Sequence, residues 1–173
     1  MTNNQSPPSL LARLRALTPM RGLDLPTAIG IADRQAAVLL RTAGITSGPV
    51  PIDVLQQVPS VRLGVTDDLP TSGISYWTGR EWRLDARTGE AKVRQRFTLA
   101  HEFKHVIDHP GRDLLYADHH AREQVADHFA AALLMPKNLL WQAWCSGTQD
   151  IAQLAELFTV STEAMTRRLL FLG

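Results

Sequence analysis

The stretch RFTLAHEFKHVIDH, residues 96–109, has two histidines four residues apart, His101 and His105, and Glu102 directly after the first. Apolar residues recur through it at three- and four-residue steps, which predicts an amphipathic helix over about 93–108. Residues four apart on a helix lie on one face, about 5–6 Å from each other. Both imidazoles can therefore reach a single metal ion from that face.

This H-E-x-x-H pattern is typical of zinc peptidases. Glu102 lies one step around the helix from His101, where it can take a proton from water at the metal without being a ligand. We interpret Glu102 as a general base and the two histidines as zinc ligands. Histidines four apart on a helix can also be ordinary surface residues, so a third ligand decides between the two interpretations.

The segment AREQVADHFAAALLMP, residues 121–136, offers that third ligand on the next predicted helix. Glu123 and Asp127 are four apart, so both can face the histidines. Glu123 would complete a site of two histidines and one glutamate and leave a fourth position for water, as in catalytic zinc sites. Asp127 would accept the spare ring N–H of a ligand histidine, most directly His101. A salt-bridged surface face is the alternative for this acidic pair.

Three further polar residues lie between the two ligand helices: Tyr116, His119 and His120. A donor at this place could stabilise the oxyanion of a tetrahedral intermediate or contact substrate. Gly111 occupies the position where the extended H-E-x-x-H-x-x-G-x-x-H pattern has its third histidine, which excludes that subclass.

The rest of the chain predicts an α+β fold, with a small antiparallel sheet packed on helices and a helical C-terminal annex. Its extended candidates are VRLGV (61–65), GISYW (73–77) and EWRLDA (81–86). Turn residues separate them, as an antiparallel meander requires, and EWRLDA is expected at the edge of the sheet. Helical patterns cover about 9–17, 27–43 and 52–58, the two ligand helices, and then 137–145, 150–158 and 162–172.

These elements divide into a loose tail over 1–8, a metallopeptidase domain over 9–136 and a C-terminal helical subdomain over 137–173. The length of 173 residues, with 45% hydrophobic and 20% charged residues, is that of an ordinary globular protein. Lys and Arg number 18 against 17 Asp and Glu, so no overall positive field favours nonspecific binding to nucleic acid.

The chain has no long apolar run and no signal-peptide pattern, so we expect a cytoplasmic protein without membrane association. Cys145 is the only cysteine, which excludes an intrachain disulfide and a four-thiolate metal site. We expect its side chain to be buried as a small hydrophobe.

The two helical segments, RFTLAHEFKHVIDH and then EQVADHFAAALLMP, closely resemble the ImmA/IrrE family of metallopeptidases. The resemblance covers about residues 30–173. It implies a zincin-like fold of the thermolysin-like (gluzincin) type, with Zn²⁺ held by His101, His105 and Glu123 and with Glu102 as the base. It also implies a zinc endopeptidase that cuts a helix-turn-helix repressor or antitoxin, often in a toxin–antitoxin pair or in transcription regulation.

Two residues depart from the family, which usually has Leu and Gly at the positions of Phe103 and Lys104. Neither position is a ligand. A lysine in place of glycine needs room for its long stem, so we expect the packing or the shape of the cleft to differ here.

Two other functions stay open. Residues 151–172 have the length of a helix-turn-helix, with Arg167 and Arg168 at its reading end. Two arginines provide little positive charge for contacts with DNA phosphates, so packing on the domain or contact with a partner is favoured over DNA binding. The other alternative is a non-proteolytic zinc-containing toxin or regulator that binds a repressor. The presence of Glu102 argues for catalysis, because a pure binding module has no need of a base.

Overall fold

The structure is a computed structural model and describes residues 7–173. Most of the predicted tail, residues 1–6, lies outside the described residues, and Pro7 and Pro8 are exposed. The elements are α1 (Leu10–Arg15), α2 (Leu25–Thr42), η1 (Ile52–Gln57), β1 (Val61–Thr66), β2 (Gly73–Trp77), β3 (Trp82–Arg87), α3 (Lys92–Asp108), η2 (His109–Gly111), α4 (Arg112–Leu115), α5 (His119–Leu134), α6 (Lys137–Cys145), α7 (Ile151–Phe158) and α8 (Thr162–Leu172).

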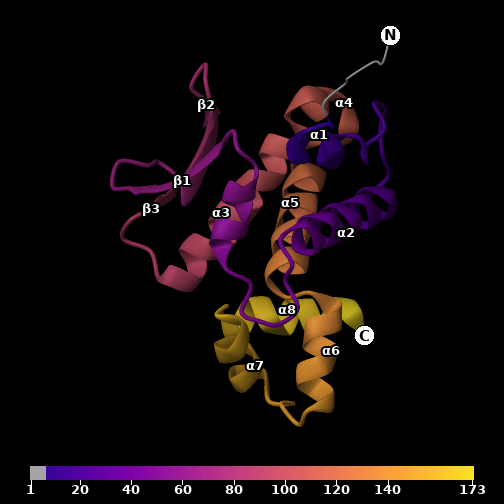
Figure 1. The fold of residues 1–173 in the computed structure, drawn as a ribbon, viewed down its shortest axis with the longest axis vertical. Helices are drawn as coiled ribbons and strands as arrows, with labels where there is room; N and C mark the ends of the chain where they lie inside the picture. Colours follow the sequence, from indigo (N-terminus) through magenta and orange to yellow (C-terminus); the bar gives the residue numbers. More distant parts are fainter. Residues whose placement is uncertain (1–6) are drawn as a thin grey trace.

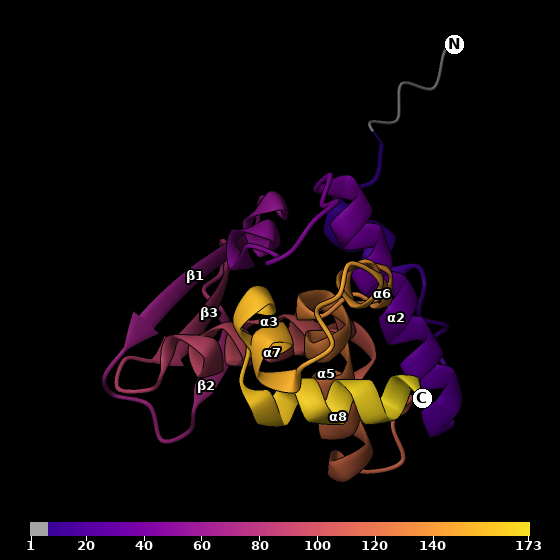
Figure 2. The ribbon, with the colours of Figure 1, turned by 90° about the horizontal axis from the view of Figure 1, so that it is seen from below.

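The sheet packs on α3, α3 packs on α5, and α5 packs on α2 (Figure 1). Figure 2 shows the sheet on one side, α2 on the other, and α3 and α5 between them. The last three helices lie together beyond one end of α5, away from α1. The predicted α+β class, with a small sheet against helices and a helical C-terminal region, is confirmed. The predicted domain boundary at 136 falls between α5 and α6 and stays a prediction.

The sheet is mixed, so the predicted antiparallel meander is wrong in one pairing. The strand order is β1-β3-β2, with β1 parallel to β3 and β2 antiparallel to it. The strand predicted at the edge, EWRLDA, is therefore the central one. Its buried residues explain this position: Trp82, Leu84 and Ala86 are all buried, whereas β2 is mostly exposed. The most buried strand takes the place where both of its edges are paired.

Helix α3 buries the face that its sequence pattern predicts. Ala100, Phe103 and Ile107 all lie in the core, and the Phe103 ring packs against Phe129 of α5 with centroids 6.1 Å apart. The buried Ala126 of α5 adds little bulk, so the two helices can approach closely. This close packing brings one polar face of each helix to the same place.

The helix ends follow from local chemistry. Asp118 caps α5 by accepting the N–H of Ala121 at 2.8 Å, and Pro136 follows its last turn. Pro110 stops α3, and the chain continues through the short turn η2. Cys145, expected to be buried, is exposed at the end of α6. Among the helices of residues 7–173, none combines the length and apolarity that a membrane crossing requires.

Lys104 lies inside the core and not on the surface, with only 1% of its area exposed. Its Nζ donates to Asp108 Oδ1 at 2.7 Å and to Gln35 Oε1 of α2 at 2.8 Å. The hydroxyl of Tyr116 donates to the other oxygen of Asp108. The lysine that departs from the family pattern is thus buried in a polar cluster that joins α2, α3 and the chain after α4.

We expect Lys104→Met to lower the free energy of unfolding by about 3 kcal/mol, because it leaves the buried Asp108 carboxylate without its cation. Urea denaturation measures this change. Glu163 and Arg167 provide a matched control, since they form an ion pair at the same i,i+4 spacing but 74% of each side chain is exposed. Arg167→Met should change stability little. Equal effects of the two substitutions would contradict a structural role for the buried pair.

Candidate metal centre

His101 and His105 of α3 and Glu123 of α5 bring three donor atoms together, all within 4.8 Å of one another. The two Nε2 atoms are 3.1 Å apart, and Glu123 oxygens lie 3.2 Å from His101 Nε2 and 3.5 Å from His105 Nε2. Donors around a tetrahedral zinc ion, at its usual bond lengths, are about 3.3 Å from each other. The three residues therefore fit a zinc ion without rearrangement, and three protein ligands leave a fourth position open.

The protonation of His105 also suits metal binding. Burial, together with the charge of His101, lowers the pKa of His105 to about 4. A ring with this pKa is neutral at physiological pH and offers a lone pair to a metal. Protons then compete little for the site.

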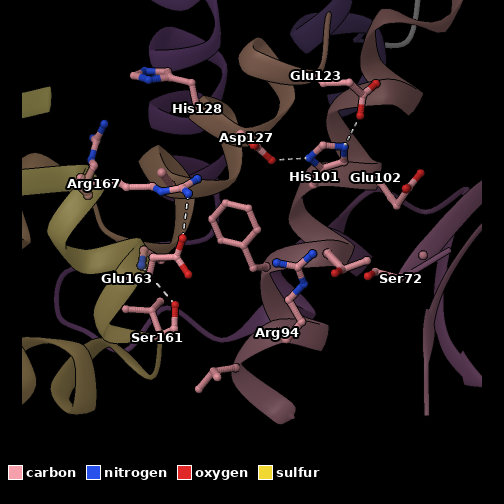
Figure 3. Close-up of a pocket in the computed structure, with 18 of the residues that line it drawn as sticks. Ser72, Arg94, His101, Glu102, Glu123, Asp127, His128, Ser161, Glu163 and Arg167 are labelled. Carbon is pink, nitrogen blue, oxygen red and sulfur yellow. Dashed lines mark hydrogen bonds and ion pairs between the residues drawn. The ribbon is translucent and has the colours of Figure 1, made fainter. Parts of the chain in front are cut away.

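Asp127 orients the other histidine. Its Oδ1 lies 2.8 Å from Nδ1 of His101, so this nitrogen carries the proton and Nε2 faces Glu123 (Figure 3). Burial lowers the pKa of His101, but the hydrogen bond and charge of Asp127, with the charges of Glu102 and Glu123, raise it overall. The carboxylate behind the ring makes the imidazole a stronger ligand.

Glu102 receives a hydrogen bond that the sequence did not indicate. Ser75 of β2 donates its hydroxyl to Glu102 Oε2 at 2.7 Å. Burial raises the pKa of Glu102 overall, although this hydrogen bond acts in the opposite direction. A carboxylate with a raised pKa and a fixed orientation is well suited to take up and return a proton.

Gly73, at the start of β2, makes this contact geometrically possible. A Cβ at Gly73 would lie 2.2 Å from Cγ2 of Thr98 and 3.4 Å from Cγ of Glu102. Any larger residue would push β2 away from α3, and Ser75 with it. Neither Gly73 nor Ser75 belongs to a recognisable motif, so spacing along the chain could not have identified them.

The three candidates for oxyanion or substrate contact lie in different surroundings in the structure. His119 is exposed, lies 3.6 Å from Glu123 through its Nε2, and lines the cavity at the metal centre. Tyr116 turns to Asp108, and burial and that carboxylate raise its pKa. His120 is exposed and does not line this cavity. Of the three, the structure brings only His119 to the site.

The family model described as the IrrE N-terminal-like domain, of peptidase family M78, matches residues 71–170. The chain belongs to this family. The match includes β2, both ligand helices and most of the C-terminal region, and it confirms the resemblance that the two helical segments indicated.

Among solved structures, the chain is similar to a Mycobacterium tuberculosis transcriptional regulator, with a TM-score of 0.58 and 17% sequence identity. The likeness covers 94% of this chain and 52% of the other, so this chain spans about half the length of that protein. At this identity the likeness shows the fold alone. No curated protein matches the chain.

In this member of the IrrE N-terminal-like family, the metal centre opens into a cavity of about 760 Å³. One wall is the start of β2 and the upstream half of α3, and the opposite wall is α8 (Figure 3). The C-terminal helices thus form part of the same cavity. Its charged wall residues outside the metal centre are Arg94, Glu163, Arg167 and Arg168.

In the metal-free protein we expect His105 to stay neutral down to about pH 4, against an ordinary pKa of 6.5. In the unfolded chain, His105 becomes protonated as the pH falls below about 6.5, whereas in the folded protein it does so only near pH 4. Acid therefore favours the unfolded chain, and His105 lowers the free energy of unfolding progressively between about pH 6.5 and 4. NMR titration of the ring, assigned with His105→Gln, measures its pKa. A midpoint near 6.5 would show that the ring is solvated and not buried as described.

Proposed function

We propose that this chain is a zinc-dependent endopeptidase. The observation that carries the proposal is the near-tetrahedral spacing of His101, His105 and Glu123, with Glu102 adjacent on the same helix. Membership of peptidase family M78 also supports the proposal, and the match covers both ligand helices. The residue set, with three ligands and a separate carboxylate base, favours a catalytic over a structural zinc.

When bound, zinc would supply Lewis-acid chemistry, polarising a peptide carbonyl and making water more acidic. Glu102 would accept the proton of the attacking water and deliver it to the leaving amine. Ser75 would hold Glu102 in one orientation through its 2.7 Å hydrogen bond. Asp127 would keep His101 in the tautomer that presents Nε2. His119 is the nearest candidate to donate to the oxyanion.

The substrate segment would bind along β2. The sequence predicted EWRLDA as the edge strand, but β3 is central, and β2 is the edge strand whose Ser75 contacts Glu102. An extended peptide could add to this edge through backbone hydrogen bonds, which read backbone more than side chains. This mode suits an exposed loop or linker as the site of cleavage.

A helix-turn-helix repressor or antitoxin stays our proposed substrate. The family resemblance of the two ligand helices supports it. Direct DNA binding by this chain is less favoured. Arg168, one of the two arginines that would read DNA, is only 5% exposed, which leaves Arg167 alone at that end of α8.

We expect the wild-type protein to bind one zinc ion per chain and His101→Ala to lose it, as measured by elemental analysis. Glu102→Gln should keep zinc but lower cleavage about 10²–10⁴-fold, because only the base is removed. If a small helix-turn-helix protein is encoded by a neighbouring gene, the assay incubates the two proteins with and without a chelator. Glu156→Gln, at an exposed position of α7, is the matched control.

An active Glu102→Gln would remove the assigned base. A zinc-loaded wild type that binds the partner and leaves it intact would favour the non-proteolytic alternative. A purified protein that takes up no zinc would end the proposal altogether.

Ser75→Ala should lower kcat about tenfold, because a hydrogen bond to a charged group is lost, and leave KM and zinc content unchanged. Ser75→Thr should restore most of the rate, since it keeps the hydroxyl. Steady-state kinetics on the same substrate separates the two parameters. Equal rates for wild type and Ser75→Ala would show that Glu102 needs no such support.

A further inference from the structure

A second cavity, of about 640 Å³, lies between α2, α5, the start of α6 and the end of α8. Much of its lining is apolar and comes from these four helices, and it includes Ala36, Leu40, Ala132, Leu139 and Leu172. None of the residues assigned to the metal centre lines it. Its size is in the usual range for small-molecule sites, about 300–1,000 Å³.

The cavity has a buried cation at its wall. Arg168 is 5% exposed and lines the cavity, and its Nε donates to the carbonyl of Met135 at 3.1 Å. Its Nη1 is buried without a hydrogen-bond partner among the described residues. Burial lowers the pKa of Arg168 although the charge of Asp33 acts in the opposite direction. A buried guanidinium with an unpaired N–H is costly, and an anion beside it would offset that cost.

The start of α6 adds positive potential at the same wall. Met135, whose carbonyl accepts the hydrogen bond from Arg168, directly precedes Pro136, and Pro136 is the N-cap of this nine-residue helix. Pro136 provides no side-chain cap, so the first-turn N–H groups have no partner from that residue. Lys137 in the first turn also lines the cavity.

The balance of charge in the cavity is positive. Arg41, Lys137 and Arg168 line it against a single carboxylate, Asp33. That carboxylate is already engaged, because His128 Nε2 lies 2.9 Å from its Oδ1. The cavity therefore combines an apolar floor with a cationic wall.

We propose that this cavity is a second ligand site, which binds a small amphipathic anion. The carboxylate or phosphate head would lie at Arg168 and the first turn of α6, where a helix N-terminus and two cations favour negative charge. The alkyl body would cover the apolar residues of α2 and α8. This site does not depend on the proposed peptidase activity.

The test titrates octanoate, octyl phosphate and 1-octanol separately into the metal-free full chain and follows backbone amides by NMR. We expect saturable shifts centred on residues 137–139 for at least one anion, and which anion binds more tightly identifies the head group. Octanol should bind at least about tenfold more weakly, because it lacks the charge. Absence of saturable shifts with both anions, or equal binding of octanol, would overturn the proposal.

Two variants avoid disturbing the buried Arg168. Lys137→Gln should weaken binding of the anion several-fold, and Lys92→Gln, at an exposed position that lines neither cavity, should not.

Ala37→Phe would fill the cavity from an exposed position of α2 and should abolish binding. Ala152→Phe, on the exposed face of α7, is its matched control. Unchanged affinity in Ala37→Phe would place the ligand elsewhere. Because the protein is metal-free, these results stand whether or not it cleaves peptides.

Discussion

The packing of α5 against α3 is the constraint on which the site depends. His101 and His105 share a face by helical geometry alone, but Glu123 reaches them only if the second helix approaches closely. Small residues such as Ala126 permit that approach, and the hydrogen bond from His101 to Asp127 fixes the rotation of one helix against the other. One interhelical contact thus sets both the spacing of the donor atoms and the tautomer of a ligand.

Lys104 shows how the core beneath this face is held. The buried lysine fills the space between α3 and Gln35 of α2, and its charge needs compensation. Asp108 and Gln35 provide it at 2.7 and 2.8 Å. Asp108 is in turn held by Tyr116, which explains why this tyrosine does not reach the metal centre. The departure from the family pattern therefore changes the packing behind the ligand helix and not the set of donors.

The sequence predicted those parts of the structure that depend on local periodicity. The helices of both ligand segments, and the shared face of each pair, His101 with His105 and Glu123 with Asp127, follow from local periodicity. The meeting of the two pairs was inferred from zinc chemistry, and the structure brings them together. Strand order was not predictable in this way, because pairing joins residues distant in sequence, and β3 proved central. The contact of Ser75 with Glu102 depends on that order, since it places Ser75 on a strand that packs against α3. Metal binding itself stays a prediction.

Helix α8 connects the metal-centre cavity and the second cavity, although the sequence suggested a separate C-terminal unit. A C-terminal helical annex could have been an independent unit, yet α8 forms a wall of the cavity at the metal centre and contributes to the second cavity. Arg168 lines both, and His128 of the first cavity contacts Asp33 of the second at 2.9 Å. The His128 side chain is buried and depends on Asp33 for a partner, whereas the half-exposed Asp33 carboxylate is also open to water. A shift of α8 would therefore change the shape of both cavities, because Arg168 lines both.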